Sequence, residues 1–306
     1  MLIVLQLLGS AWFVHSGVGG ELLNYLLAIP AAVVLMLGVC CVWKAYAPLK
    51  IRRKTLHLSA ADSQLDGLRV LHISDIHGRI GLIDKQRITD VVEMGQVDLV
   101  AVTGDLVCKY FPNLKEPLEF LRELTHHIPV FYVPGNHDYW AAEAHELRDQ
   151  IEATGARALF NQHSQLTFQS EGKKRQITLV GIEDPYTDRA DLVTAAEGVD
   201  ASTSLLLAHS PGIFAQAAER SFPLVLCGHT HGGQVRVPLL GAPYIPGQSG
   251  LFPRYDWGLF HCRSSQMFIS AGIGSSKLPI RFGTAAEVWL FTLRAEGGDE
   301  SSRESC

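Results

Sequence analysis

The chain has 306 residues, of which 47% are hydrophobic and 19% are charged, and its formal net charge is −5. This apolar content excludes intrinsic disorder, because the chain has ample hydrophobic surface to bury. Six cysteines are too few for a disulfide-framework fold, and the net negative charge gives no reason to expect nucleic acid as a partner.

The first part of the chain is almost free of charge. Residues 1–43 contain one formal charge, Glu21, and the stretch 22–43 contains none. A helix over that stretch is about 33 Å long, enough to cross a hydrocarbon core of about 30 Å. No basic segment precedes it and no small-residue cleavage site follows it, so we expect a retained membrane anchor over 1–43 rather than a signal peptide. The apolar residues 1–14 could form a second short span or an interfacial segment.

A basic cluster follows the expected span immediately. Its members are Lys44, Lys50, Arg52, Arg53 and Lys54. Because basic flanks stay in the cytoplasm, the cluster predicts an inner (cell) membrane protein whose remaining chain lies on the cytoplasmic side. We expect residues 44–67 to be a basic juxtamembrane linker, whose charges could also rest against anionic lipid head groups.

Residues 68–294 are predicted to form an α/β domain, followed by a polar tail at 295–306. Short apolar runs that end in turn residues indicate buried strands at 69–74, 97–104, 129–135, 203–210 and 223–228. Amphipathic stretches between them indicate helices at 83–94, 116–126, 141–154, 188–197 and 211–220. Further strands at 165–169, 176–182, 267–270 and 287–293 have less helix between them, which favours a second sheet with antiparallel character. The long segment 239–257 has no clear period, and a loop of that length in a compact domain is typically functional.

Each of the five buried strands ends in side chains that bind hard cations. In chain order these are Asp75 and His77, then Asp105, then Asn136, His137 and Asp138, then His209, and finally His229 and His231. The carboxyl ends of such strands form sites in α/β sheets. Carboxylate, imidazole and amide groups without a cysteine suit Mn²⁺, Zn²⁺ or Fe rather than a structural zinc knuckle. The set is too large for one ion, so we expect two divalent ions, with Mn²⁺ favoured, that share a carboxylate and act on phosphoesters.

The motifs DIHG (75–78), GD (104–105), GNHD (135–138), His209 and GHTHGG (228–233) occur in this order, and the chain resembles the calcineurin-like metallophosphoesterases. The resemblance implies a four-layer α/β/β/α sandwich of two mixed sheets. It implies that one metal is held by Asp75, His77 and His231, that the other is held by Asn136, His209 and His229, and that Asp105 bridges them. It also implies that His137 lies beside the scissile phosphate as an acid or electrostatic stabiliser, with Asp138 orienting it.

Three basic residues near the motifs, Arg79, Lys109 and Arg281, could contact the substrate, although a surface or salt-bridge role is an equal alternative. The segments QVRVP (234–238) and PIRFG (279–283) resemble a membrane-associated bacterial branch of the family. That branch includes the calcineurin-like UDP-2,3-diacylglucosamine pyrophosphatase of lipid A synthesis.

Three functions are compatible with these features. The first is an anchored pyrophosphatase that releases UMP from a lipid-linked nucleotide, with the apolar loop 239–257 holding the acyl chains. The second is a membrane-anchored phosphodiesterase or phosphatase with another phosphoester substrate. The third is a non-catalytic scaffold, which is disfavoured because relatives of that kind lose a ligand or the acid histidine, and both Asp105 and His137 are present.

Overall fold

The computed structural model describes residues 18–78, 85–110, 112–141, 144–170, 172–237, 239–245, 248, 250–275 and 279–296. Its helices are α2 (Val18–Ala45), α3 (Lys85–Glu93), α4 (Lys115–Thr125), α5 (Asn136–Ala141), α6 (Ala144–Glu152), α7 (Leu192–Ala195) and α8 (Phe214–Glu219). Its strands are β1 (Lys50–Leu58), β2 (Arg69–Ile73), β3 (Leu99–Thr103), β4 (Val130–Val133), β5 (Arg157–Ala158), β6 (Gln162–Ser170), β7 (Lys173–Gly181), β8 (Ser204–Leu207), β9 (Leu224–Cys227), β10 (Gly258–Cys262), β11 (Ser265–Ile269) and β12 (Glu287–Ala295).

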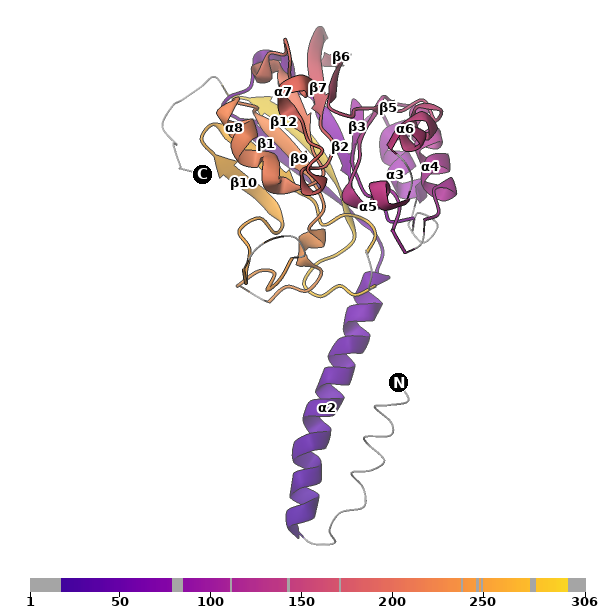
Figure 1. The fold of residues 1–306 in the computed structure, drawn as a ribbon, viewed down its shortest axis with the longest axis vertical. Helices are drawn as coiled ribbons and strands as arrows, with labels where there is room; N and C mark the ends of the chain where they lie inside the picture. Colours follow the sequence, from indigo (N-terminus) through magenta and orange to yellow (C-terminus); the bar gives the residue numbers. More distant parts are fainter. Residues whose placement is uncertain are drawn as a thin grey trace.

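The described strands form two mixed sheets that pack face to face, with helices on the outer faces (Figure 1). The order of the first sheet is β1-β12-β2-β3-β4-β5, and that of the second is β10-β11-β9-β8-β7-β6. Within the first sheet, β12–β2 is the one antiparallel pair among the described strands. The second sheet has an antiparallel pair at each end, β10–β11 and β6–β7. The expected four-layer α/β/β/α sandwich is therefore confirmed.

Three apolar clusters hold the layers together. The central one lies between the sheets and includes Val70, Phe131, Leu205 and Phe291, all fully buried. The outer clusters pack α3, α4 and α6 on the first sheet and α7 and α8 on the second. Strands such as β3 and β9 are buried along their whole length, which explains why their sequences are continuous apolar runs.

The predicted linker 44–67 is wrong, because Lys50–Leu58 is strand β1. All nine of its residues pair in parallel with β12, and Leu56 and Leu58 enter the core between the sheets. The basic cluster that marks the end of the span therefore continues into the first strand of the domain. Strand β12 also differs from expectation, since it lies between β1 and β2 in the first sheet rather than in the second.

Helix α2 projects away from the sandwich (Figure 1). Its residues 25–45 have a mean hydropathy of 2.5, and none of this stretch is buried against the rest of the described chain. Among the described residues, α2 is the one helix that is long and apolar enough to cross a membrane. This result rests on length and composition, and a signal sequence would meet the same criteria. The predicted segments 1–14 and Arg79, and nearly all of the polar tail, lie outside the described residues.

Candidate metal centre

The ends of strands from both sheets meet at the candidate site. Strands β2, β3 and β4 of the first sheet lead into Asp75 and His77, Asp105, and Asn136. Strands β8 and β9 of the second sheet lead into His209, and into His229 and His231. The site therefore spans the seam between the two sheets, and it forms only when they pack together.

Five of these side chains sit on backbone of positive φ. The φ angle is 52° at Asp75, 53° at His77, 55° at Asp105, 70° at His229 and 52° at His231. Outside glycine this conformation costs about 1–2 kcal/mol per residue. Five such residues in one place are a concentration of strain of the kind that functional sites hold.

Two glycines make room for the carboxylates. A Cβ atom on Gly228 would lie 1.8 Å from Ser74 Oγ and 2.3 Å from Asp75 Oδ2. A Cβ atom on Gly135 would lie 2.3 Å from Asp105 Oδ1. Neither position can carry a side chain without displacing the carboxylate beside it.

The first group of converging ligand atoms comes from Asp75, His77 and His231. The Nε2 atoms of His77 and His231 are 3.0 Å apart, and His231 Nε2 is 3.5 Å from Asp75 Oδ1. His77 Nδ1 lies 3.2 Å from the carbonyl oxygen of Val107 and donates to it. That bond leaves the lone pair of His77 Nε2 directed at the other two side chains.

The second group comes from Asn136, His209 and His229. His229 Nδ1 lies 2.9 Å from Asn136 Oδ1 and 3.3 Å from His209 Nε2. His209 Nδ1 donates to the carbonyl oxygen of Thr103 at 2.8 Å, so His209 Nε2 also faces the group. The same arrangement of a backbone-bonded imidazole thus occurs in both groups.

Asp105 lies between the two groups. Its Oδ2 is 3.6 Å from His77 Nε2 and 3.3 Å from His209 Nε2. Its Oδ1 accepts from the backbone N–H of His137 at 2.8 Å, which holds the carboxylate in place. The position is the one that a carboxylate shared by two ions requires.

Burial controls the ionisation of the imidazoles. It lowers the pKa of His77 and of His229 to about 3 and holds the pKa of His231 well below its ordinary value, so all three are neutral at pH 7 and able to bind metal. At His209 burial also opposes the charge, but the carboxylates of Asp105, Asp75 and Asp184 together outweigh burial and raise the pKa. Burial raises the pKa of Asp75 to about 7, although the charge of His209 opposes the shift.

These donors fit two divalent cations. Imidazole nitrogens that face one another at 3.0 Å and 3.3 Å, with buried carboxylates beside them, are an arrangement that a cation between them stabilises. The His and Asp clusters therefore indicate a dinuclear divalent-metal site.

His137 lies beside this centre rather than in either group. Its ring centroid is 4.8 Å from that of His77 and 4.8 Å from that of Trp140. Its Nδ1 accepts from the backbone N–H of Lys109 at 3.2 Å, and burial lowers its pKa. The neutral ring therefore carries its proton on Nε2.

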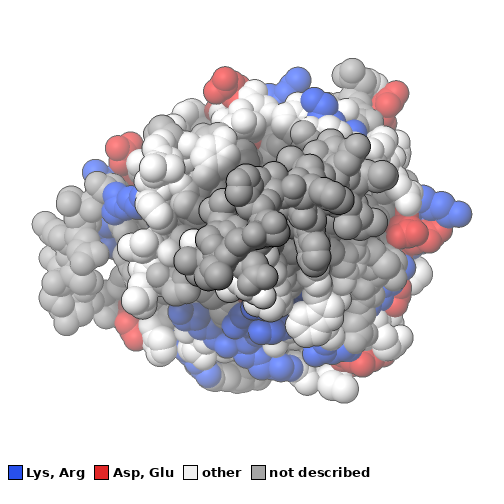
Figure 2. Space-filling model, turned by 90° about the horizontal axis from the view of Figure 1, so that it is seen from below, with Lys and Arg blue, Asp and Glu red and all other residues white. Residues whose placement is uncertain are grey.

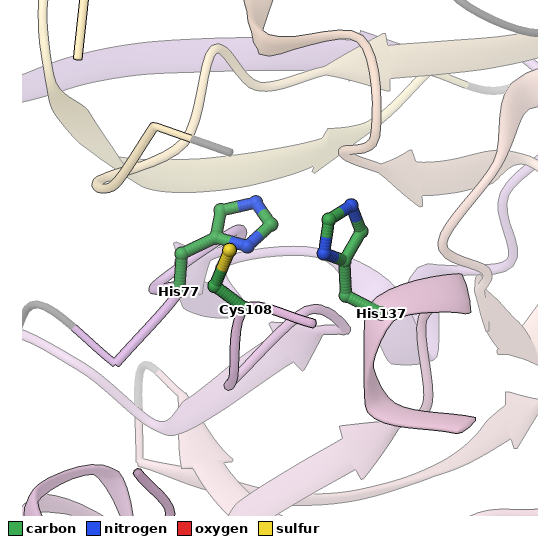
Figure 3. A group of neighbouring side chains, drawn as sticks. All are labelled: His77, Cys108 and His137. Atoms are coloured by element: carbon green, nitrogen blue, oxygen red, sulfur yellow. The ribbon is translucent and has the colours of Figure 1, made fainter. Parts of the chain in front are cut away.

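A cysteine that the ligand motifs do not include lies beside the constellation. The Sγ atom of Cys108 and the ligand nitrogens of His77 and His137 all lie within 4.8 Å of one another. Figure 3 shows the thiol and the two rings on the same side of the segments that carry them. The available signal was the position of Cys108, three residues after Asp105 in the same loop.

Asp138 does not have the expected orienting contact with His137. Its Oδ2 accepts from the backbone N–H groups of Asp105 at 2.8 Å and Gly135 at 2.9 Å and from the Tyr132 hydroxyl at 2.8 Å. Its Oδ1 accepts from the backbone N–H of Val107 at 3.2 Å. Asp138 therefore fixes the loops that carry the ligands.

Arg281 is likewise wrong as a substrate contact, because it is fully buried. Its guanidinium donates to the backbone carbonyls of Ala271 at 2.9 Å, Gly274 at 2.5 Å and Ala285 at 3.1 Å. It supports the loop before β12. Lys109 is exposed, and its Nζ lies 4.7 Å from the centroid of the Trp140 ring.

One further buried acid at the site was missed. Asp184 is fully buried, accepts from the backbone N–H of Tyr186 at 3.2 Å, and accepts from the hydroxyl of Ser210, the residue after His209. Burial raises its pKa. The signal was its position three residues after β7, where the other strands also deliver polar side chains.

A cavity of about 350 Å³ opens onto the centre. Its lining includes Asp105, Asn136, His137, His229 and His231. The segments after β9 and before β12 contribute Val235, Pro243, Tyr244 and Ile280 to the lining. The lining thus combines the polar ligand side chains with apolar ones.

Comparison with known proteins identifies the family. The calcineurin-like phosphoesterase family profile matches residues 68–233. The chain is 28% identical to the uncharacterized metallophosphoesterase YkoQ of Bacillus subtilis, over 72% of this chain and 82% of that one. It is 30% identical to phosphodiesterase YaeI of Escherichia coli, over 68% of this chain and 75% of that one. It is 27% identical to a transmembrane protein with metallophosphoesterase domain of Danio rerio, over 86% of this chain and 61% of that one.

The profile covers more than half of the chain, and every motif that carries the ligand atoms lies within or at the end of the matched residues. The Bacillus subtilis and Danio rerio relatives are described as metallophosphoesterases, and the Escherichia coli relative is described as a phosphodiesterase. The chain belongs to the calcineurin-like phosphoesterase family, and it is a metal-dependent phosphoester hydrolase.

Proposed function

We propose that this chain is a membrane-anchored phosphodiester or diphosphate hydrolase with two metal ions. Asp75, His77 and His231 hold one ion, and Asn136, His209 and His229 hold the other. Asp105 bridges them. The observation that carries this assignment is the place of Asp105 Oδ2, at 3.6 Å from His77 Nε2 and 3.3 Å from His209 Nε2.

The chemistry follows from this arrangement. Two divalent ions in such a site supply an activated water and neutralise the charge of the phosphate. His77 and His209 keep their Nε2 atoms toward the centre because their Nδ1 atoms donate to backbone carbonyls. His137 presents its Nε2–H to the cavity and donates to a phosphoryl or leaving-group oxygen. A neutral donor fits the lowered pKa of His137 better than an imidazolium does.

We favour Mn²⁺ as the ion, with Zn²⁺ and Fe as alternatives. The donor set of imidazoles, carboxylates and one amide oxygen suits all three. Cys108, whose thiol lies beside His77, is a soft donor that would shift the balance toward Zn²⁺ or Fe.

We also propose that α2 anchors the chain in the inner membrane with the domain on the cytoplasmic side. Support comes from the exposed apolar stretch 25–45 and from the basic residues that follow it. We assign residues 50–295 to the domain that α2 anchors, because β1 at the start of this range pairs with β12 at its end. Alkaline phosphatase and β-galactosidase fusions after Lys54 test the side, and a periplasmic signal would overturn it.

The candidate substrate with the most specific support is a lipid-linked nucleotide diphosphate such as UDP-2,3-diacylglucosamine. Pro243 and Tyr244 of the 239–257 segment line the cavity, and the exposed apolar side chains of the same segment, among them Leu240 and Leu251, suit acyl chains. A second candidate is a plain phosphodiester, which the name of the Escherichia coli relative favours.

The test is UMP release from UDP-2,3-diacylglucosamine by the detergent-solubilised full chain with Mn²⁺, with Asp105→Ala as the blank. Release above the blank supports the lipid-linked nucleotide. Hydrolysis of an aryl phosphodiester without UMP release supports the second candidate. Hydrolysis of neither would contradict the proposed activity.

A further inference from the structure

The end of α2 is fixed against the wall of the metal-site cavity. The backbone N–H of Arg281 donates to the carbonyl oxygen of Cys41, in the last turns of α2, at 3.0 Å. The Lys44 ammonium lies 5.3 Å from the centroid of the Phe282 ring. Ile280, the residue before this contact, lines the metal-site cavity. The membrane boundary and the cavity wall are therefore parts of one connected structure.

A second cavity, of about 360 Å³, lies at this junction. Lys44 lines it together with Arg236, Val237, Leu239 and Phe282. Because Lys44 belongs to the last turn of α2, the boundary of any bilayer that α2 crosses lies close to Leu239. The segment after β9 must then meet the lipid surface, and Figure 1 shows its loops at the end of the domain from which α2 emerges.

Several apolar side chains of that segment are exposed. Val237 and Gly241 exchange two backbone hydrogen bonds, of 2.8 Å and 3.0 Å, so that Leu239 and Leu240 lie at the tip of a tight turn. Leu239 is fully exposed and Leu251 is 77% exposed. We define the apolar face as Val237, Leu239, Leu240, Tyr244, Leu251 and Phe252, all of them exposed. Exposed apolar patches of this kind mark interaction sites.

The charges around the apolar face match a lipid surface. Seen from the side of α2, Lys and Arg side chains gather in the lower part of the view, and further ones lie at the edges together with Asp and Glu (Figure 2). Lys44 and Arg236 border the apolar face. Asp256 pairs with Arg236 at 2.7 Å, so Lys44 supplies the less compensated charge. Basic residues at this depth are attracted to anionic lipid phosphates.

We propose that the apolar face docks into the head-group region of the bilayer that α2 enters, with Lys44 and Arg236 toward the lipid phosphates. This rests on the membrane anchoring proposed above. Tyr244 belongs both to the apolar face and to the wall of the metal-site cavity. The docked face therefore holds the mouth of that cavity at the lipid surface, where phosphoesters carried by lipids enter it without leaving the bilayer.

The test places a photo-reactive diazirine amino acid in the full-length chain at Leu240, or at Leu251, or at Val193. Val193 is the matched control. It is apolar, its exposed fraction of 66% is close to the 64% of Leu240, and it lies on α7, outside the apolar face. Each chain is reconstituted into vesicles of equal parts phosphatidylcholine and phosphatidylglycerol. After illumination, mass spectrometry identifies what each position has captured.

We expect about tenfold more lipid adduct at Leu240 and Leu251 than at Val193, with phosphatidylglycerol in excess. Equal capture at all three positions, or capture of a second copy of the chain, would overturn the docking. Equal capture of the two lipids would overturn the role given to Lys44 and Arg236. A chain that does not float with the vesicles would overturn the anchoring itself.

Hydrolysis of a water-soluble aryl phosphodiester by each preparation is measured in parallel. It reports the metal centre and is independent of lipid contact. Lipid adducts without hydrolysis contradict the proposed activity and leave the docking intact. Hydrolysis without preferential lipid adducts contradicts the docking alone.

Discussion

The backbone N–H of Asp105 donates to Asp138 Oδ2 at 2.8 Å. Asp138, the acid that follows His137, thus holds the loop of Asp105 instead of the histidine ring. The same oxygen accepts from Gly135 and Tyr132, so one buried carboxylate connects the ends of β3 and β4. This relationship assigns Asp138 to positioning the centre.

We expect Asp138→Asn to lower the free energy of unfolding by about 2–3 kcal/mol, because hydrogen bonds to a buried charged group contribute about 1.5–3 kcal/mol each. The matched control Tyr132→Phe removes only the hydroxyl donor and should cost about 1.5 kcal/mol, the lower end of that range. Urea denaturation measures both, with metal content as a second readout. Unchanged stability with lower turnover would instead support an orienting role toward His137.

Asp105→Ala should abolish hydrolysis, because it removes the oxygen that lies between the two ligand groups. Metal analysis of the purified chain should show fewer than two ions. The control is Asp191→Ala, whose carboxylate is exposed and accepts from Thr194. A chain that binds two ions and turns over normally without the Asp105 carboxylate would refute its bridging position.

His137→Ala should keep the metal content and lower kcat by about 10²–10⁴-fold, the range of a positioned proton donor. The exposed histidine His126, at the end of α4, provides the control substitution His126→Ala. Turnover on an aryl phosphodiester and metal content are measured on the same samples. Full turnover of His137→Ala would exclude it as the donor.

Gly228→Ala should displace Ser74 or Asp75, because its Cβ would lie 1.8 Å from Ser74 Oγ. We expect loss of the ion held by Asp75 and loss of activity, seen by metal analysis and by hydrolysis. Gly212→Ala is the matched control, since its Cβ meets no described atom within 4 Å and its φ is not positive. Equal metal content in the two variants would contradict the tight packing around Asp75.

Removal of the metal with a chelator should lower the melting temperature, because ions that bind only the folded chain stabilise it by about 2.7 kcal/mol at about 100 times Kd. Readdition of Mn²⁺, Zn²⁺ or Fe²⁺ in turn should restore the melting temperature, and the ion that also restores hydrolysis is the functional one. Differential scanning fluorimetry measures the shift. Asp105→Ala should show a smaller shift than the wild-type chain, and an equal shift would place the ion elsewhere.

Much of the site could be predicted because its signals are local. Each ligand follows an apolar run directly, and a run that ends in a turn residue predicts a buried strand whatever lies around it. The positions of Asp75, Asp105 and His209 after their strands therefore needed no tertiary information. The uncharged stretch 22–43 was readable for the same reason, since length and composition decide whether a helix can cross a membrane.

The roles of individual side chains could not be read in this way. Asp138 and Arg281 have the composition of catalytic residues, and only their buried contacts with backbone groups show that they support loops. Cys108 looked peripheral in the sequence, yet folding brings its thiol beside His77 and His137. The sequence did not indicate strand β1, because most of its first residues are basic and the alternation of apolar and polar residues covers only its last few positions.

The sequence by itself thus determined which groups could bind metal and in which order the strands deliver them, because both depend on neighbours along the chain. Only the tertiary structure decided which ligands share a group and where the cavity opens. His77 and His231 are 154 residues apart and meet at 3.0 Å because the two sheets pack face to face. Contacts of that kind depend on the burial of apolar surface between the sheets, and that burial is a property of the whole fold.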